Sequence, residues 1–353
     1  MDITEIDKNF KLATVTETDV EWIDVRDNRV SLHGVYYQNG EYIRMPKEVG
    51  ASVTPWLEEM SAYTAGGRLR FVTDSPYVAL KCLGRKVGLM THVSALLTTG
   101  FSLLADGALG GVYMPTINQI VGAEKAIDFD GICRFEGKQK RVFELYFPMY
   151  GGVHELYVGV QAGSVFEKAP AYTHQKPIVF YGSSITQGAC ASRPGNDYIA
   201  HVCRWLDSDY INLGFSGSAK AESTVVDHLA SIDASVYVID YDHNAPTPEY
   251  LEKTHYPLYE RIRKQQKDTP IVFMSKPDFE NGIQNNTIRR EIIRRTYDKA
   301  RDNGDNNVYF INGEDMFGTE DRVACTVDKG HPNDLGFYRM AKAVYPVLKQ
   351  ILG

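Results

Sequence analysis

The sequence predicts an α/β protein of two domains, a β-sandwich of the jelly-roll type followed by a parallel sheet covered by helices. Three observations lead to this prediction. The chain has 353 residues, which exceeds the usual single-domain size of about 150 residues. Short β-branched and aromatic runs, separated by turn residues, fill the first half. After Pro177, apolar runs alternate with longer amphipathic stretches, which is typical of βαβ units.

The first half, from Trp22 to about Gly163, is expected to be antiparallel. Asn39-Gly40 and Asp106-Gly107 are turn dipeptides, because these residue types tolerate positive φ in tight hairpins. The longest stretch without a charged residue, 87–105, is interrupted by polar residues, so we interpret it as paired strands and not as a membrane helix. Seven or more strands with almost no long helical pattern indicate a sandwich or jelly roll. Examples of the predicted strands are 30–37, 69–73, 77–82, 101–105, 140–147 and 156–160.

The second half is expected to contain five parallel strands with helices on both faces of the sheet. The change of pattern places the boundary between Ala169 and Lys176, which gives domains 1–170 and 171–353. Strands are predicted at 178–181, 210–213, 236–240, 271–274 and 308–311, and helices around 196–206, 222–231, 248–266, 286–302 and 334–351.

Composition excludes several classes of protein and of partner. With 43% apolar and 24% charged residues, the chain is globular and not disordered or fibrous. A net charge of -7 gives no attraction for nucleic acid or an anionic membrane, so a small or neutral partner is expected, and a homo-oligomer is left open. The basic segment 289–301 is interpreted as the solvated face of a helix whose apolar stripe contains Ile288, Ile292 and Ile293.

Cysteine usage and the start of the chain bear on the cellular compartment. Five cysteines form no C-x-x-C pair, so we expect reduced thiols, without a disulfide framework or a cysteine zinc site. The acidic start has no basic region followed by an apolar run, so no secretory signal is expected in it. A cytoplasmic protein is expected, or a secreted one if a signal has been removed.

Polar residues follow four of the five predicted parallel strands, where ligands bind in open sheets of this kind. The first group is Gly-Ser-Ser-Ile-Thr-Gln-Gly at 182–188, in which Gly182 allows a sharp turn and the Ser184 hydroxyl is a candidate nucleophile. Taken alone, such a segment is more often an ordinary tight turn. The serine needs a base before it can be assigned a role.

His331 is the candidate base and Asp328, three residues earlier, is the candidate anion that orients it. A serine hydroxyl needs an imidazole to remove its proton, and the imidazole needs an anion to fix its tautomer and stabilise its cation. The alternative is a polar helix entry in which Pro332 fixes the turn and Asn333 or Asp334 caps the helix.

Gly217 and Asn244 are the candidates for stabilising negative charge on a substrate oxygen. Gly217 follows the second strand and could offer its backbone N–H at close range, because no Cβ obstructs a substrate. Asn244 follows the third strand, and its side-chain amide could donate to the same oxygen. Each of these residues, taken singly, is more often part of a turn.

Together, four blocks in fixed order resemble the SGNH hydrolase superfamily, also called GDSL-like esterases and acylhydrolases. The blocks are G-S-S-I-T, N-L-G-x-S-G, D-x-x-x-N and D-x-x-H-P, and the resemblance covers residues 176–353. It implies a flavodoxin-like three-layer α/β/α domain without a cofactor or metal. It also implies roles for five residues: Ser184 as nucleophile, His331 as base, Asp328 as its partner, and the Ser184 N–H, the Gly217 N–H and the Asn244 amide as the oxyanion hole.

The chain departs from the family pattern at two positions. Ser183 stands where the first block commonly has aspartate, and His243 directly precedes Asn244. Neither change removes a triad or oxyanion group, but both put the substrate preference in question. The β-rich first half resembles a two-domain esterase subgroup that includes carbohydrate esterases, so we expect a serine esterase that removes a small acyl group, acetyl above all, from an oligosaccharide.

Three other functions compete with this expectation. The first is a lipase or acylhydrolase acting on other acyl esters. The second is a metal-dependent phosphoesterase that uses Asp240, Asp242, His243 and Asp278 as ligands. The third is a noncatalytic sugar-binding protein, against which the unbroken set of four blocks argues.

Overall fold

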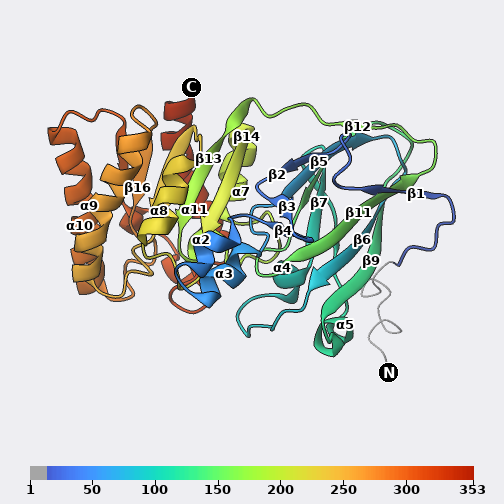
Figure 1. The fold of residues 1–353 in the computed structure, drawn as a ribbon, viewed down its shortest axis with the longest axis horizontal. Helices are drawn as coiled ribbons and strands as arrows, with labels where there is room; N and C mark the ends of the chain where they lie inside the picture. Colours follow the sequence, from blue (N-terminus) through green and yellow to red (C-terminus); the bar gives the residue numbers. More distant parts are fainter. Residues whose placement is uncertain (1–13) are drawn as a thin grey trace.

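Two antiparallel sheets form one end of the molecule, and a parallel sheet covered by helices forms the other (Figure 1). The structure is a computed structural model and describes residues 14–353. The acidic start of the chain, on which the expectation of no secretory signal rests, lies outside the described residues. None of the helices in residues 14–353 has an apolar stretch of the length that crossing a bilayer requires.

The two antiparallel sheets enclose one apolar core, which confirms the predicted sandwich. Leu69 pairs with Leu145 in one sheet and Leu80 pairs with Val158 in the other, and all four side chains belong to the same buried cluster. The first sheet has the order β1 (Val20–Asp24), β11 (Val153–Gln161), β6 (Tyr77–Arg85) and β9 (Ala126–Arg134). The second has the order β12 (Phe166–Lys168), β5 (Arg68–Thr73), β10 (Arg141–Tyr146), β7 (Phe101–Ala105) and β8 (Ala108–Tyr113), with β2 (Ser31–His33) also paired to β5.

Both predicted turn dipeptides join hairpins. Asn39-Gly40 connects β3 (Tyr36–Gln38) to β4 (Glu41–Ile43) with φ of 52° and 90°, and Asp106-Gly107 connects β7 to β8 with φ of 50° and 81°. The single strand predicted at 30–37 is wrong: the chain forms β2 and β3 instead. Gly34 separates them at φ 72°, where a Cβ would lie 2.2 Å from the carbonyl oxygen of Gly66.

The prediction of paired strands over 87–105 is also wrong, because only β7 is a strand in this stretch. Ser94 caps a short helix, α4 (Ala95–Thr99), by accepting a hydrogen bond from the backbone N–H of Leu97 at 3.0 Å. Sequence patterns also missed three other short helices: α2 (Lys47–Ala51), α3 (Pro55–Ser61) and α5 (Ile117–Gly122).

The second half forms the predicted three-layer α/β/α domain. All five predicted strands are present and parallel, in the order β14 (Ser208–Gly214), β13 (His174–Gly182), β15 (Val236–Asp240), β16 (Ile271–Met274) and β17 (Val308–Ile311). In order along the chain this is 2-1-3-4-5, the flavodoxin-like arrangement. The helices are α6 (Ser184–Gln187), α7 (Tyr198–Leu206), α8 (Ser223–Ser231), α9 (Pro248–Gln265), α10 (Ile283–Asp302) and α11 (Asp334–Leu352), with two 3-10 turns at Gly313–Asp315 and Arg322–Cys325.

The two faces of the parallel sheet are covered by different helices. Ile178 and Phe180 of β13 pack with α7 and α11 on one face, whereas Val179 and Tyr181 pack with α8, α9 and α10 on the other. The alternation of neighbouring side chains along β13 thus separates the two helical layers. Because both faces are covered, the strand segments 178–181, 236–239 and 271–274 are continuous apolar runs, and this is the pattern that predicted them.

Side chains from the first half complete the core of the parallel sheet. One face receives Ala65, Val93, Leu97, Met149 and Tyr150, and the other receives Met45, Leu57, Met60 and Tyr63. The proposed boundary between residues 170 and 171 lies in the connection from β12 to β13. The two halves are therefore distinct along the chain but share apolar cores in space.

Two buried arginines from the first half hold β14, the edge strand of the parallel sheet. Arg44 donates to the carbonyl oxygens of Asn212 at 3.1 Å and Gly214 at 2.5 Å. Arg68, with 0% of its side chain exposed, donates to the carboxylate of Asp209 at 2.5 Å. The Arg68 guanidinium also lies 3.5 Å from the ring centroid of Tyr210. These contacts satisfy the open edge of β14 and fix the first half against it.

We expect Arg68→Ala to lower the free energy of unfolding by about 3–5 kcal/mol, because it removes one partner of a buried ion pair. Arg70→Ala is the matched control on the same strand. The Arg70 guanidinium stacks on the ring of Tyr172 at 4.0 Å, and its loss should cost about 1 kcal/mol. Urea denaturation followed by circular dichroism measures both values, and equal small losses would contradict the anchoring role of Arg68.

Candidate active site

Ser184 lies at the carboxyl end of β13, where a tight turn leads directly into α6. The turn has no room for a side chain at Gly182, since a Cβ there would lie 2.1 Å from the carbonyl oxygen of Asp240. Ser183 caps α6, and its hydroxyl accepts a hydrogen bond from the N–H of Ile185 at 3.2 Å. Ser184 is the first residue of α6, so its backbone N–H donates no hydrogen bond to a carbonyl of the helix.

The structure brings Ser184, His331 and Asp328 together. Ser184 Oγ lies 2.9 Å from His331 Nε2, and His331 Nδ1 lies 2.7 Å from Asp328 Oδ2. Because Nδ1 faces a carboxylate, it carries the proton, and Nε2 is left to accept the proton of the serine hydroxyl. This arrangement has the hydrogen bonds that a serine nucleophile, a general base and an orienting anion would need.

Asp328 is held as an anion by its own loop. Its Oδ1 accepts hydrogen bonds from the backbone N–H groups of His331 at 2.8 Å and Gly330 at 3.1 Å. Burial alone would raise the pKa of Asp328, but these bonds and the His331 ring lower it to about 2.

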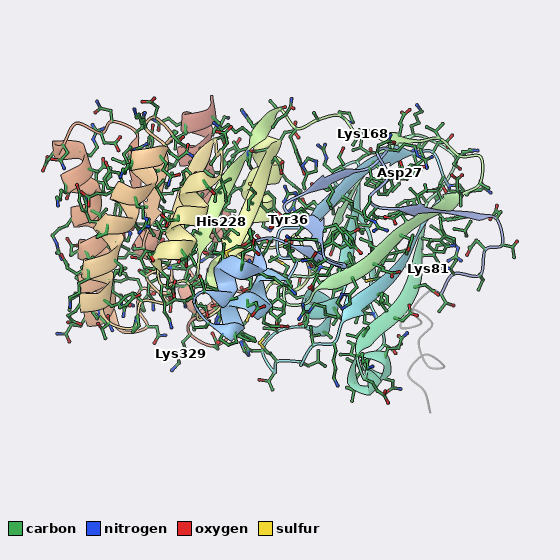
Figure 2. All side chains as sticks on the ribbon, viewed as in Figure 1. Asp27, Tyr36, Lys81, Lys168, His228 and Lys329 are labelled. Atoms are coloured by element: carbon green, nitrogen blue, oxygen red, sulfur yellow. The ribbon has the colours of Figure 1, made fainter. Side chains whose placement is uncertain are left out.

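Of the two predicted caps of the last helix, Asn333 is the one that caps it, accepting from the N–H of Gly336 at 3.1 Å. The next residue after Asp328, Lys329, projects from the surface (Figure 2).

Gly217 and Asn244 lie on the loops that follow the two strands beside β13. Gly217 has φ of 70°, a conformation that favours glycine, and no atom lies within 4 Å of where its Cβ would be. Asn244 Oδ1 accepts from the N–H of Ala219 at 3.1 Å. With its oxygen engaged in this way, Asn244 has its Nδ2 group left to donate to a bound oxygen.

Several contacts that the sequence did not predict hold these loops in position beside Ser184. Gln187 Oε1 accepts from the N–H of Ser216 at 2.9 Å, and Gln187 Nε2 donates to the carbonyl of Met149 at 3.0 Å. Tyr150 donates its hydroxyl to the carbonyl of Ser184 at 3.4 Å. Gln187 directly follows the block G-S-S-I-T, so its position indicated that it lies near Ser184, but nothing in the sequence connected Tyr150 with Ser184.

Arg289 corrects the interpretation of the basic segment as a wholly solvated face. It is buried, and it donates to the carbonyls of Asp242 at 2.6 Å and Ala245 at 2.9 Å, so it supports the loop that carries Asn244. Ile292 and Ile293 are buried as predicted, whereas Ile288 is exposed. Arg289, and not Ile288, therefore lies on the inward side of α10.

Asp240, Asp242, His243 and Asp278 do not converge as metal ligands. The one set of three histidine, cysteine or acidic ligand atoms within 4.8 Å of one another in residues 14–353 is elsewhere, at His92, Cys190 and His331. Asp240 instead accepts from the hydroxyl of Thr186 at 3.2 Å, and Asp242 accepts from the N–H of Lys276 at 3.1 Å. This spacing does not favour the metal-dependent phosphoesterase alternative.

Asp278 is a buried carboxyl group near the Asn244 loop. Its Oδ2 lies 3.2 Å from Lys276 Nζ, and its Oδ1 lies 3.7 Å from His243 Nε2. Burial raises the pKa of Asp278 to about 6, although Lys276 opposes the shift. Burial likewise raises the pKa of Asp242 to about 6 and lowers that of His243, which is therefore neutral.

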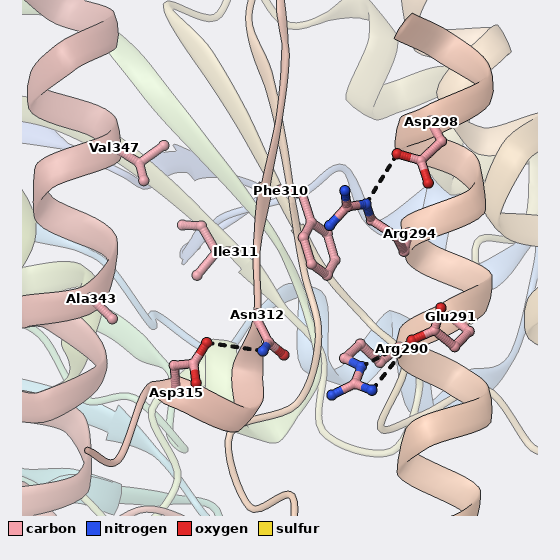
Figure 3. Close-up of a pocket in the computed structure, with 10 residues that line it drawn as sticks. All are labelled: Arg290, Glu291, Arg294, Asp298, Phe310, Ile311, Asn312, Asp315, Ala343 and Val347. Carbon is pink, nitrogen blue, oxygen red and sulfur yellow. Dashed lines mark hydrogen bonds and ion pairs between the residues drawn. The ribbon is translucent and has the colours of Figure 1, made fainter. Parts of the chain in front are cut away.

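Two of the pockets on the parallel-sheet half adjoin the chain between residues 310 and 329. One of about 740 Å³ lies beside β17 between α10 and α11, and no predicted site residue lines it (Figure 3). The other, of about 370 Å³, adjoins the segment that carries Asp328. Its lining contains four charged side chains: Asp278, Glu280, Arg322 and Lys329.

Two family models match the chain. Residues 175–349 match the GDSL-like lipase/acylhydrolase family, and residues 20–166 match the N-terminus of SGNH-hydrolase-type esterases. The matched segments correspond to the parallel-sheet half and the sandwich half. No curated protein matches the sequence of the chain.

Solved structures match over nearly the whole chain. A protein from Bacteroides ovatus described as a GDSL-like lipase has 28% identity and a TM-score of 0.83, over 94% of this chain and 98% of its own. The salicylyl-acyltransferase SsfX3 of a tetracycline biosynthetic pathway has 19% identity and a TM-score of 0.77, over 95% and 98%. An acetyl xylan esterase from Butyrivibrio proteoclasticus has 13% identity and a TM-score of 0.62, over 95% and 99%. The last two show a shared fold.

We expect Asp278→Asn to stabilise the protein at neutral pH relative to wild type. A carboxyl group whose pKa is raised in the folded state favours folding below its unfolded pKa of about 4, and this contribution is lost as pH rises through the folded value of about 6. Wild type should therefore lose stability relative to Asp278→Asn as pH rises. The difference between their free energies of unfolding should change in favour of the variant by about 2–3 kcal/mol between about pH 4 and pH 7.5.

Denaturant titrations at several pH values measure this difference. The control is Asp302→Asn, at an exposed position at the end of α10, and its difference from wild type should not change with pH. Parallel stability curves for wild type and Asp278→Asn would show that folding does not raise the pKa of Asp278.

Proposed function

Because the chain belongs to the GDSL-like lipase/acylhydrolase family and is an ester-hydrolysing enzyme, we propose that it is a serine esterase with Ser184, His331 and Asp328 as its catalytic triad. The observation that carries the proposal is the continuous hydrogen-bonded path from Ser184 Oγ to His331, at 2.9 Å, and on to Asp328, at 2.7 Å. Such a path gives a neutral hydroxyl the nucleophilicity that acyl transfer needs.

The proposed reaction has two steps. In the first, His331 Nε2 removes the proton of Ser184 as Oγ attacks the ester carbonyl, and the imidazolium is stabilised by Asp328. The tetrahedral oxyanion accepts hydrogen bonds from the N–H groups of Ser184 and Gly217 and from the Asn244 amide. The imidazolium then protonates the leaving alcohol. In the second step His331 activates water, which releases the acid from the serine ester.

We propose that the acyl group is small, acetyl above all, and that the alcohol is an oligosaccharide. The pocket beside the Asp328 segment combines ionic groups with apolar surface from Phe317 and Val323, so it could contact both the hydroxyl groups and the ring faces of a sugar. A long acyl chain would need an extended apolar cleft. The acetyl xylan esterase, whose fold is shared, acts on an acetylated polysaccharide by its own description. The lipase-like alternative remains as a reaction on other acyl esters.

Loss of the proposed oxyanion donor should slow the chemistry without preventing binding. We expect Asn244→Ala to lower kcat by about 10²–10³ with little change in KM, because the interaction strengthens only in the transition state. Steady-state kinetics on a nitrophenyl acetate substrate measures the effect. Asn303→Ala, at the exposed end of α10, is the control and should behave as wild type. An unchanged kcat in Asn244→Ala would remove that residue from the oxyanion hole.

The nucleophile has a more direct test. Wild type should react covalently with a fluorophosphonate probe, and Ser184→Ala should not, because only an activated serine reacts readily.

Asp328→Asn should lower kcat by about 10⁴, since the imidazole loses its correct tautomer. A wild-type protein that fails to label while binding oligosaccharide would favour the noncatalytic sugar-binding alternative.

A panel of esters tests the substrate class. Short-chain and long-chain nitrophenyl esters are compared with acetylated xylo- and manno-oligosaccharides, each with wild type and Ser184→Ala. We expect higher kcat/KM for acetyl than for long acyl groups, and release of acetate from at least one oligosaccharide. A preference for long acyl chains would support a lipase-like enzyme instead.

A further inference from the structure

A second chemical feature overlaps the triad. His92, Cys190 and His331 each offer a ligand atom, and these three atoms lie within 4.8 Å of one another. The residues come from separate segments: His92 precedes α4 in the first half, Cys190 follows α6, and His331 precedes α11. The rings of His92 and His331 have centroids 5.5 Å apart. The cluster therefore bridges the two halves of the chain beside Ser184.

The donor set suits zinc. Imidazole nitrogen and thiolate sulfur are preferred ligands of Zn²⁺, with bonds of about 2.0–2.3 Å, which puts neighbouring ligand atoms of a tetrahedron about 3.5 Å apart. The three ligand atoms lie up to 4.8 Å from one another, so they must move about 1 Å closer together to bind one zinc ion. His92 is exposed and lies on a loop, so it is the ligand that can move. Three protein ligands leave the fourth position to water.

Asp328 adds the usual support of a zinc-binding histidine. Its carboxylate accepts from His331 Nδ1 at 2.7 Å, so Nε2 is the nitrogen that can bind a metal. Cys190 is buried, at φ of 70°, a conformation that costs a non-glycine residue energy. Its thiol is not part of the proposed ester chemistry. Metal binding would convert this thiol to a thiolate and release its proton to solvent.

We propose that His92, Cys190 and His331 form an inhibitory Zn²⁺ site that switches the enzyme off. The metal takes the lone pair of His331 Nε2, which is the atom that must accept the proton of Ser184. A bound metal and the catalytic hydrogen bond are therefore mutually exclusive. Removing the metal restores the base. Only the inhibitory consequence rests on the proposed function, since binding itself requires no catalysis.

Binding is tested first on Ser184→Ala, which lacks the proposed nucleophile and keeps all three ligands. Calorimetric titration with ZnCl₂ should show one Zn²⁺ per chain, and adding His92→Ala or Cys190→Ser should weaken binding at least about tenfold. Co²⁺ should give a thiolate-to-metal charge-transfer band that Cys190→Ser removes. His228→Ala, at a half-buried position on α8 (Figure 2), is the matched control, because His228 is not one of the three clustered ligands.

Inhibition is then tested on the active enzyme. Micromolar Zn²⁺ should inhibit wild type and His228→Ala, and a chelator should restore the activity. His92→Ala should keep the zinc-free turnover within about twofold and raise the inhibitory concentration at least about tenfold. Absence of Zn²⁺ binding to Ser184→Ala, or equal binding with and without His92, would overturn the site. An inactive wild type that binds Zn²⁺ through these residues would instead contradict the proposed function and leave the metal site standing.

Discussion

The buried edge of β14 is the constraint on which the arrangement of the molecule depends. An edge strand has unpaired carbonyl groups, and burying them without donors is costly. Arg44 and Arg68, both from the first half of the chain, supply those donors and are themselves buried. Since β14 leads into the loop that carries Gly217, the same contacts set the position of the first half relative to Ser184, His331 and Asp328. Tyr150 and His92 reach the site for this reason.

Burial changes the pKa values of the carboxyl groups near the loop that carries Asn244. Asp242 and Asp278 are buried carboxyl groups with a raised pKa, and Lys276 lies against Asp278. Arg289 is buried beside the same loop and holds its carbonyl groups. The loop that carries Asn244 is therefore held by a buried arginine and lies near two carboxyl groups that ionise around pH 6. Lys276 offsets the charge that Asp278 acquires on ionisation.

The parallel-sheet half, and the meeting of Ser184, His331 and Asp328 at one edge of its sheet, could be predicted from sequence because their signals are local. Each strand is a short apolar run, and Ser184, Gly217 and Asn244 each follow a strand within a few residues, so topology alone places them at one edge. The contributions of the first half depend on contacts between distant segments. The cysteine pattern gave no indication of a metal site, because Cys190 has its partners at His92 and His331, 98 and 141 residues away. Residues 87–105 were misassigned because a capped single-turn helix has too few residues to show a period.

The shared cores bear on how such a protein can change during evolution. Met45, Leu57 and Met60 fill space beneath the helices of the parallel sheet, although they belong to the other half of the sequence. Gene fusion or recombination near residue 170 would exchange one half and leave unfilled volume in the other, at a cost of several kcal/mol for each large side chain lost. The two halves are therefore expected to be inherited as a pair, with substitutions at their contact surface compensating one another.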